Sequence, residues 1–145
     1  MNVFLLKYLS LLLRPNGKIK FLTSQKENTK ILDVGCGNNS PYRVKSILPL
    51  CKYTGIDIDD YNQDKPNLAD NYIITSPETF SNKIEKLKDH FETVLCAHNL
   101  EHCNNPQKTL DAMMTCLKLN GEIFLSFPSS NTVNFPNRRG TLNYY

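Results

Sequence analysis

Residues 30–40 read KILDVGCGNNS, and this stretch decides the fold of the chain. Lys30–Val34 is a short apolar run that is typical of a buried strand, and the two glycines behind it let the backbone turn sharply. Pro41–Leu48 has the composition of a helix, with Ser40 as its expected N-cap and Pro41 at its first position. A strand, a Gly-x-Gly loop and a helix in this order are typical of nucleotide-binding α/β domains.

The rest of the chain continues the alternation of strands and helices. Four further apolar runs predict strands at Lys52–Ile58, Asn71–Thr75, Phe91–Ala97 and Glu122–Phe127. A helix is expected to begin at Ser76, and a second helix spans Asn105–Leu119 and ends in a turn at Asn120-Gly121. The apolar faces of these helices consist of Phe80, Ile84 and Leu87 and of Leu110, Met113, Met114 and Leu117. The alternation predicts an α/β fold with a parallel sheet that is covered on both faces.

A chain of 145 residues has the size of a single domain. Residues 28–128 contain every predicted strand and form the expected domain. Residues 1–27 are expected to form an apolar helix over Met1–Leu13 and a linker, and residues 129–145 a loop or a disordered tail. The apolar run is shorter than the roughly 18 residues that a membrane span requires, and contact of residues 1–13 with a membrane surface is an alternative that we do not favour.

Charge and cysteine content exclude several classes of protein. The chain has 17 Lys and Arg residues and 14 Asp and Glu residues, which gives a net charge of +3. The basic residues are scattered and mostly lysine, so no nucleic acid partner is expected. The five cysteines are odd in number and include no Cys-x-x-Cys pair, so neither a disulfide framework nor a zinc ribbon is expected. Reduced thiols favour a cytoplasmic location.

Two acidic side chains accompany the glycine loop and narrow the choice of ligand. Asp57 follows Gly37 by 20 residues, at the end of the second predicted strand, where a carboxylate can accept hydrogen bonds from both ribose hydroxyls. Asp33 precedes the loop, and an acid there favours a cationic ligand over a pyrophosphate. A dinucleotide loop has a third glycine where this chain has Ser40, which argues against a dehydrogenase, and the Gly-Lys-Ser/Thr of a P-loop is missing. The combination fits S-adenosylmethionine, which has a zwitterionic methionine end and a positive sulfonium.

Four segments resemble, in order, the motifs of class I S-adenosylmethionine-dependent methyltransferases, and are closest to a small methyltransferase-domain group. They are ILDVGCGNNS at 31–40, YTGIDIDD at 53–60, FETVLCAHNLEH at 91–102 and LKLNGEIFLSFPS at 117–129. The resemblance implies a Rossmann-like parallel sheet with strand order 3-2-1-4-5 and the cofactor at the carboxyl ends of its first four strands. It also implies transfer of a methyl group to a small-molecule, sugar or lipid-precursor acceptor.

The resemblance further implies which residues bind the cofactor. These residues are Asp33, Gly35, Cys36 and Gly37 at the methionine end, Asp57 at the ribose, Ile58 at the adenine, and Ala97, His98 and Asn99 beneath the methionine and the sulfonium. Asp33 would interact with the amino group, directly or through water. The family often has an acid after the third strand that binds the adenine, and this chain has Thr75 or Ser76 to replace it.

The segment from His98 to His102 also matches the H-x-x-E-H pattern of some zinc peptidases. That pattern needs both histidines on one face of a helix, but here the run leaves a strand and stands close before Pro106, so no metal site is expected. In the methyltransferase interpretation the segment is the floor of the transfer site, and His102 or His98 is the candidate general base. The alternative is that His102 holds loop backbone groups and that Glu101 is a structural acid near a helix N-terminus.

The chain ends soon after the fifth predicted strand, whereas the family usually adds a further helix and an antiparallel strand pair. We therefore expect a chain that is truncated relative to its family and lacks that final pair. The fifth strand would then be an open sheet edge, covered by residues 128–145 or by a partner chain in an oligomer. Arg138 and Arg139 are either contacts for an anionic substrate or solvated charges. A catalytically inactive protein of this fold, acting as a partner subunit, is the alternative function.

Overall fold

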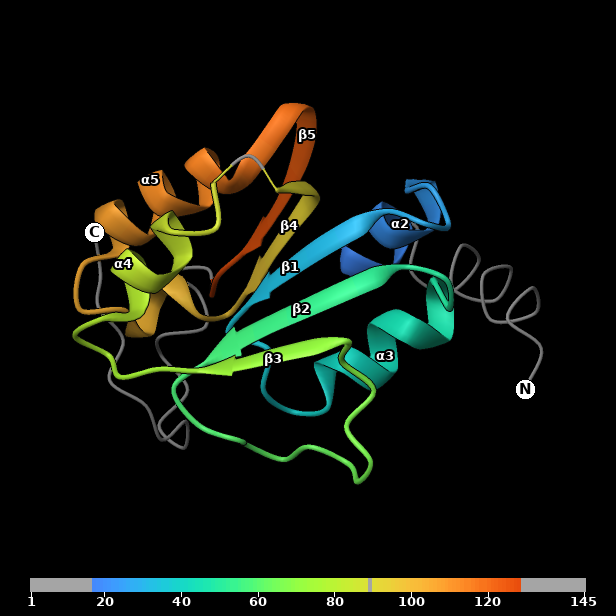
Figure 1. Cartoon of the computed structure of the whole chain (residues 1–145), viewed down its shortest axis with the longest axis horizontal. Helices are drawn as coiled ribbons and strands as arrows, with labels where there is room; N and C mark the ends of the chain where they lie inside the picture. The colour runs from blue at the N-terminus through green and yellow to red at the C-terminus, as the bar shows by residue number, and fades with distance from the viewer. Residues whose placement is uncertain (1–16, 89, 129–145) are drawn as a thin grey trace.

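A parallel five-stranded sheet forms the centre of the molecule (Figure 1). The computed structural model describes residues 17–88 and 90–128. The strands are β1 (Lys30–Val34), β2 (Lys52–Asp57), β3 (Asn71–Ile74), β4 (Phe91–Ala97) and β5 (Leu117–Ser126). Their order is β3-β2-β1-β4-β5, and every neighbouring pair is parallel, which confirms the predicted fold class and strand order.

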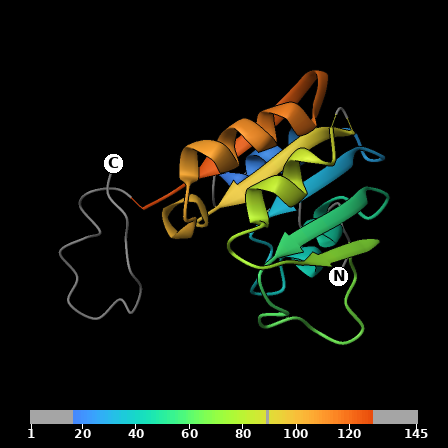
Figure 2. The ribbon, with the colours of Figure 1, turned by 60° about the vertical axis from the view of Figure 1, so that its left-hand side comes forward.

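Helices cover both faces of this sheet (Figure 2). They are α2 (Lys18–Ser24), α3 (Ser40–Ile47), α4 (Phe80–Glu85) and α5 (Pro106–Cys116), with a 3₁₀ turn, η1, at Leu100–His102. On one face α4 and α5 bury Phe80, Ile84 and Met113, and on the other face α2 and α3 bury Leu22 and Val44. Each such side chain contributes roughly 1.5–3 kcal/mol of hydrophobic stabilisation.

Strand β1 shows how the sequence separates these two cores. Leu32 and Val34 belong to the core under α4 and α5, whereas Ile31 belongs to the core under α2 and α3. A strand that is buried on both faces reads as a nearly continuous apolar run, and β1 follows this rule at every buried position except Asp33. By the alternation of the strand, Asp33 shares the face of Ile31. The sheet therefore places one acid inside the α2–α3 core, directly before the glycine loop.

Two helix starts differ from the prediction because the residues expected there have other hydrogen-bond partners. Helix α3 begins at Ser40, and its N-cap is Asn39 in the left-handed conformation with φ of 59°. Ser40 does not cap the helix, because its hydroxyl donates to Oδ2 of Asp33 at 2.6 Å. Helix α4 does not begin at Ser76, because the amide of Thr79 donates to the carbonyl of Ser76 and closes a separate turn.

The predicted long helix before the fifth strand is also shorter in the structure. Helix α5 ends at Cys116, and Leu117 already belongs to β5. The predicted turn at Asn120-Gly121 is an irregularity within β5, where Asn120 has φ of 64°. Met113 is fully buried as predicted, but Met114 is 54% exposed. The buried stripe of the helix consists of Thr109, Ala112, Met113 and Cys116.

The two ends of the chain carry predictions that lie outside the described residues. These are the helix at Met1–Leu13 and the tail at 129–145, with Arg138 and Arg139. Within the expected linker, Lys18–Ser24 forms α2 and buries Leu22. Strand β5 is one edge of the sheet, since no other strand of the described residues pairs with its outer side. None of the described helices is long and apolar enough to span a membrane.

Candidate functional site

The glycine loop lies at the carboxyl end of β1, where two glycines permit close contacts. Gly35 has φ of 76°, and a Cβ atom there would lie 2.5 Å from Cβ of Asn99, which follows β4. At Gly37, a Cβ atom would lie 3.1 Å from Cδ1 of Tyr61 and 3.4 Å from Oδ2 of Asp57. The absence of side chains at these glycines thus lets the loop, the end of β2 and the segment after β4 meet.

Asp57, the last residue of β2, is held by backbone amides. The amide of Ile58 donates to its Oδ1 at 2.7 Å, and the amide of Gly37 also donates to the carboxylate. Burial raises the pKa of Asp57, these two amides lower it, and the nearby charges of Asp33 and Asp59 raise it again. The net shift is upward, so the fold holds this carboxylate at an electrostatic cost, which is common at functional sites.

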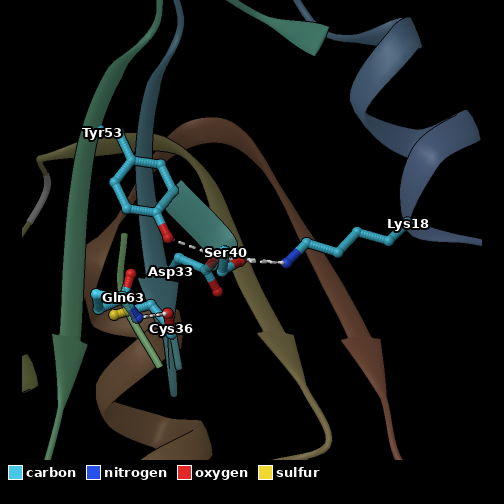
Figure 3. A network of polar contacts seen from close by, with 6 residues as sticks. All are labelled: Lys18, Asp33, Cys36, Ser40, Tyr53 and Gln63. Carbon is cyan, nitrogen blue, oxygen red and sulfur yellow. Dashed lines mark hydrogen bonds and ion pairs between the residues drawn. The ribbon is translucent and has the colours of Figure 1, made fainter. Parts of the chain in front are cut away.

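Asp33 lies behind the glycine loop and is only 1% exposed (Figure 3). Its Oδ2 accepts hydrogen bonds from the hydroxyls of Ser40 at 2.6 Å and Tyr53 at 2.7 Å, and from Nζ of Lys18 at 3.3 Å. Burial and the charge of Asp33 raise the pKa of Tyr53 well above its usual range, so the Tyr53 hydroxyl stays protonated and acts as a hydrogen-bond donor to Asp33. The other oxygen, Oδ1, is buried and has no hydrogen-bond partner among the described residues.

The loop after β2 lies against the glycine loop and is tied to it by hydrogen bonds. The amide of Asn38 donates to the carbonyl of Tyr61 at 3.0 Å, and Nε2 of Gln63 donates to the carbonyl of Cys36 at 2.9 Å. The side chain of Cys36 takes no part in this contact, because it is fully buried in the α2–α3 core, where burial raises the pKa of its thiol. Cys36 therefore offers its backbone, and not its sulfur, to the predicted site.

A cavity of about 630 Å³ lies beside these groups. Four predicted site residues line it, namely Asp57, Ile58, Asn99 and His102. The predicted residues outside its lining are Asp33, Gly35, Cys36, Gly37, Ala97 and His98. The sequence did not single out several others that line it, among them Tyr61, Glu78, Phe80, Ser81, Asn105 and Lys108. Cavities of roughly 300–1000 Å³ are typical of small-molecule and cofactor sites, so this cavity has room for a nucleoside.

The residues proposed to replace the adenine-binding acid have other partners. The hydroxyls of Thr75 and Ser76 lie 2.8 Å and 3.1 Å from Oγ1 of Thr79, within the turn before α4. Neither residue lines the cavity, whereas Glu78 from the same turn does. Hydrogen bonds from its own backbone amide and from Ser76 lower the pKa of Glu78. An acid is therefore available at this wall, two residues later than Ser76.

The two candidate bases have different surroundings. His102 lines the cavity as the last residue of η1. His98 follows β4 with φ of 54°, and its Nε2 lies 3.3 Å from Oγ of Ser126 at the end of β5. Nδ1 of His98 lies 3.8 Å from Oε1 of Glu101. The two histidines thus lie at different places around Asn99, and only His102 belongs to the cavity.

Sequence reasoning did not find the residues that support Asp33. Tyr53 lies in the second predicted strand, and its hydroxyl, buried in β2, is the one local signal of a polar partner. Lys18 lies 15 residues before Asp33 on a separate helix, and no sequence pattern links the two. Gln63 belongs to a polar loop in which no residue stands out.

The family of the chain follows from its similarity to known sequences. The sequence profile described as a methyltransferase domain matches residues 5–145. The chain belongs to the methyltransferase domain family. This membership confirms the class predicted from the motifs, whose methyl donor is S-adenosylmethionine.

Individual members resemble the chain at lower similarity. An uncharacterised protein of Methanocaldococcus jannaschii is 31% identical over 103 residues, which make up 66% of this chain and 27% of that protein. A coclaurine N-methyltransferase bound to N-methylheliamine and S-adenosylhomocysteine is 15% identical, with a TM-score of 0.56 over 83% of this chain and 34% of the other. A SAM-dependent methyltransferase from Archaeoglobus fulgidus is 16% identical, with a TM-score of 0.52 over 84% of this chain and 51% of the other. The chain thus shares the methyltransferase fold and spans about a quarter to a half of the length of these relatives.

Proposed function

We propose that residues 28–128 bind S-adenosylmethionine and serve its methyl transfer to a small-molecule, sugar or lipid-precursor acceptor, in the cytoplasm. The observation that carries the proposal is the carboxylate of Asp57, which lines the cavity and lies against Gly37. A carboxylate at the end of this strand can accept hydrogen bonds from both ribose hydroxyls. The match to the methyltransferase domain family supports the same ligand.

The residues behind the glycine loop fit the methionine end of this cofactor. Oδ1 of Asp33 is buried without a hydrogen-bond partner among the described residues, and a bound ammonium group would satisfy it. Nζ of Lys18 lies 3.3 Å from the same carboxylate and offers a positive charge to the methionine carboxylate. Gly35 would let the methionine approach the backbone, next to Asn99.

The lining of the cavity suggests how the rest of the cofactor is held. Ile58 is 53% exposed at the cavity and offers an apolar surface to the adenine. Glu78 takes the place of the acid that the family often has after β3. Ala97 and His98, at the end of β4, would lie beneath the sulfonium.

The acceptor would meet the methyl group near the segment after β4. His102 and His98 remain the candidate bases, and an acceptor with a poorly ionised hydroxyl would need one of them. The coclaurine N-methyltransferase complex supports a small-molecule acceptor, since its bound ligand is a small amine. Among the residues that the structure describes, no strand pairs with the outer side of β5, which supports an oligomer in which a partner covers this edge.

Isothermal titration calorimetry with S-adenosylmethionine and S-adenosylhomocysteine tests the proposal. Asp57→Asn should weaken the binding of both by about 10- to 100-fold, because charge-assisted hydrogen bonds to the ribose are lost. Asp60→Asn is the matched control, since this acid is three residues away and outside the cavity lining, and it should leave binding within about twofold. Absence of binding by the unmodified chain, or equal affinities of the two variants, would contradict the proposal. Methyl transfer by the chain alone would exclude the inactive-subunit alternative.

A further inference from the structure

Glu101 is a buried acid that the proposed cofactor site does not use. It is 8% exposed in η1, and its Oε2 is buried with no hydrogen-bond partner among the described residues. A buried polar oxygen without a hydrogen-bond partner destabilises a fold, and more so when it is charged. A hydrophobic side chain of similar size would avoid this cost, and we therefore infer that the carboxylate of Glu101 has a function of its own.

His98 faces this carboxylate and is itself held at a cost. Its Nδ1 lies 3.8 Å from Oε1 of Glu101, and its backbone has φ of 54°, which is unfavourable for a residue with a Cβ atom. The strained conformation is fixed by the amide of His98, which donates to the carbonyl of Ser126 at 2.7 Å. The buried acid and the strained backbone thus converge on one imidazole ring.

The other side of the ring is largely exposed and contacts one hydroxyl. The side chain of His98 is 59% exposed, and its Nε2 lies 3.3 Å from Oγ of Ser126. A proton on Nδ1 would point at the carboxylate of Glu101, and Nε2 would then hold the lone pair that accepts the hydroxyl proton of Ser126. The opposite tautomer would place a lone pair against a carboxylate. The contacts therefore favour the Nδ1–H form, with a hydroxyl already bonded to Nε2.

We propose that Glu101 is the positioning residue of the acceptor side. Its carboxylate holds the Nδ1–H tautomer of His98, so that Nε2 takes the proton of a hydroxyl acceptor that replaces the hydroxyl of Ser126 during methylation. His98 lies outside the cavity lining but directly before Asn99, which belongs to it, so the acceptor would approach from that side. The proposal rests on the proposed methyltransferase function and assigns the acceptor to the hydroxyl compounds. The distance of 3.8 Å is expected to shorten when the ring becomes charged, as hydrogen bonds of catalytic groups often do.

The proton and charge balance of this step is simple. When bound, the cofactor would supply a methyl carbon on a positive sulfur, and that sulfur would keep the electron pair of the carbon–sulfur bond. The acceptor oxygen gains the bond to the methyl carbon and gives its proton to Nε2 of His98. The imidazolium formed in this way faces the carboxylate of Glu101, and it returns the proton to water after the product leaves. General base catalysis of this kind contributes about 10²- to 10⁴-fold to a rate.

Nitrogen NMR of the histidine rings tests the tautomer without any cofactor. Long-range ¹H–¹⁵N spectra distinguish Nδ1–H from Nε2–H rings, and His98→Asn identifies the signals of His98. In the unmodified chain, neutral His98 should be in the Nδ1–H form, and in Glu101→Leu it should shift to the Nε2–H form. The ring of His90, which meets the ring of Phe91 edge-on, is an internal control and should not change. An unchanged tautomer of His98 in a folded Glu101→Leu variant would overturn the proposal.

Ser126→Ala is the matched variant, because it removes the hydroxyl at Nε2 and leaves Glu101 in place. The Nδ1–H tautomer of His98 should persist in Ser126→Ala. If this tautomer were lost in Ser126→Ala and kept in Glu101→Leu, Ser126 would be the positioning residue and the proposal would be overturned. The kinetic test uses a hydroxyl acceptor. Glu101→Leu should lower kcat by about 10- to 100-fold and leave the Kd of S-adenosylmethionine within about twofold, because Glu101 acts on the acceptor and not on the cofactor. A changed Kd with an unchanged kcat would contradict the acceptor role. Failure of the unmodified chain to bind the cofactor would instead refute the proposed function, and the tautomer result would still stand.

Discussion

The two ends of the site treat their buried acids differently. At the β1–β2 end, Asp33 receives two hydroxyls and an ammonium, and Asp57 receives two backbone amides. At the β4–β5 end, Oε2 of Glu101 has no hydrogen-bond partner among the described residues, and its Oε1 lies 3.8 Å from Nδ1 of His98. The first end therefore has most of its contacts before any ligand binds, with Oδ1 of Asp33 as the exception, whereas the second end gains its contacts with a charged ring. This difference suggests that the fold specifies the cofactor more strongly than it specifies the acceptor.

Gly35 is the point at which the two ends meet, and its substitution should have the largest effect. Gly35→Ala would place a Cβ atom 2.5 Å from Cβ of Asn99 and would strain a backbone with φ of 76°. We expect a loss of about 2–4 kcal/mol in the free energy of unfolding and a loss of cofactor binding. Chemical denaturation measures the first effect and calorimetry the second.

Gly17→Ala is the matched control for this change. Gly17 also has a positive φ, of 100°, but a Cβ atom there would meet nothing within 4 Å. Gly17→Ala should therefore lower the free energy of unfolding by about 1–2 kcal/mol through backbone strain alone, and cofactor binding should be retained. Equal effects of the two substitutions on binding would show that the contact between Gly35 and Asn99 does not matter.

Tyr53→Phe should have an intermediate effect, because it removes one of the three donors to Asp33 and leaves the ring in the core. The buried carboxylate then loses a hydrogen bond, and we expect a decrease of about 1–2 kcal/mol in the free energy of unfolding. Tyr42→Phe is the control, since Tyr42 is 51% exposed, and it should change stability by less than about 0.5 kcal/mol. A change at Tyr53 no larger than that at Tyr42 would mean that the network around Asp33 is not organised by its donors.

Asp57→Asn should raise the melting temperature of the ligand-free protein by about 1–4 °C at neutral pH. The pKa of Asp57 is raised in the folded state, so its ionisation destabilises the fold once the pH exceeds that raised pKa. The penalty is absent below the ordinary value of 3.8, and the advantage of the variant should shrink as the pH falls towards that value. Thermal unfolding over a pH series measures this, and a lower melting temperature of the variant at neutral pH would contradict it.

Glu101→Leu should change stability least, by less than about 1 kcal/mol and in either direction. The substitution removes a buried oxygen that has no hydrogen-bond partner among the described residues, and it keeps most of the side-chain volume. Thermal unfolding of this variant beside Tyr53→Phe compares the two ends directly. A loss of several kcal/mol at Glu101 would show that the acceptor end is as firmly organised as the cofactor end.

The sequence predicted the strands better than the helix ends. The two most deeply buried strands, β1 and β4, have nearly continuous apolar runs, and both have the predicted bounds. Ser40 was expected to cap α3, but its hydroxyl bonds to Asp33, seven residues away and in the core. Leu117 was expected to be helical, but it pairs with β4. Contacts between distant segments override local preference in both cases.

The candidate site was predictable to the extent that it depends on local motifs. Asp57 and Asn99 lie in recognisable segments at strand ends, and both line the cavity. Lys18 and Gln63 were missed because they reach the glycine loop from segments whose placement depends on the folded chain. A sequence motif predicts which residues lie at the end of a strand, whereas the residues that pack against them from distant segments depend on the tertiary fold.

All five cysteines are buried thiols, and they lie in different parts of the fold. Burial raises the pKa of Cys51 to about 11 and that of Cys96 to about 12, so both are neutral thiols at pH 7. An alkylating reagent can then modify each cysteine only when the segment around it opens. Since Cys36 lies in the glycine loop and Cys116 at the end of α5, the order of alkylation would show whether the cofactor loop opens before the sheet and its helices separate. The native thiols thus form a ready-made set of probes for local unfolding.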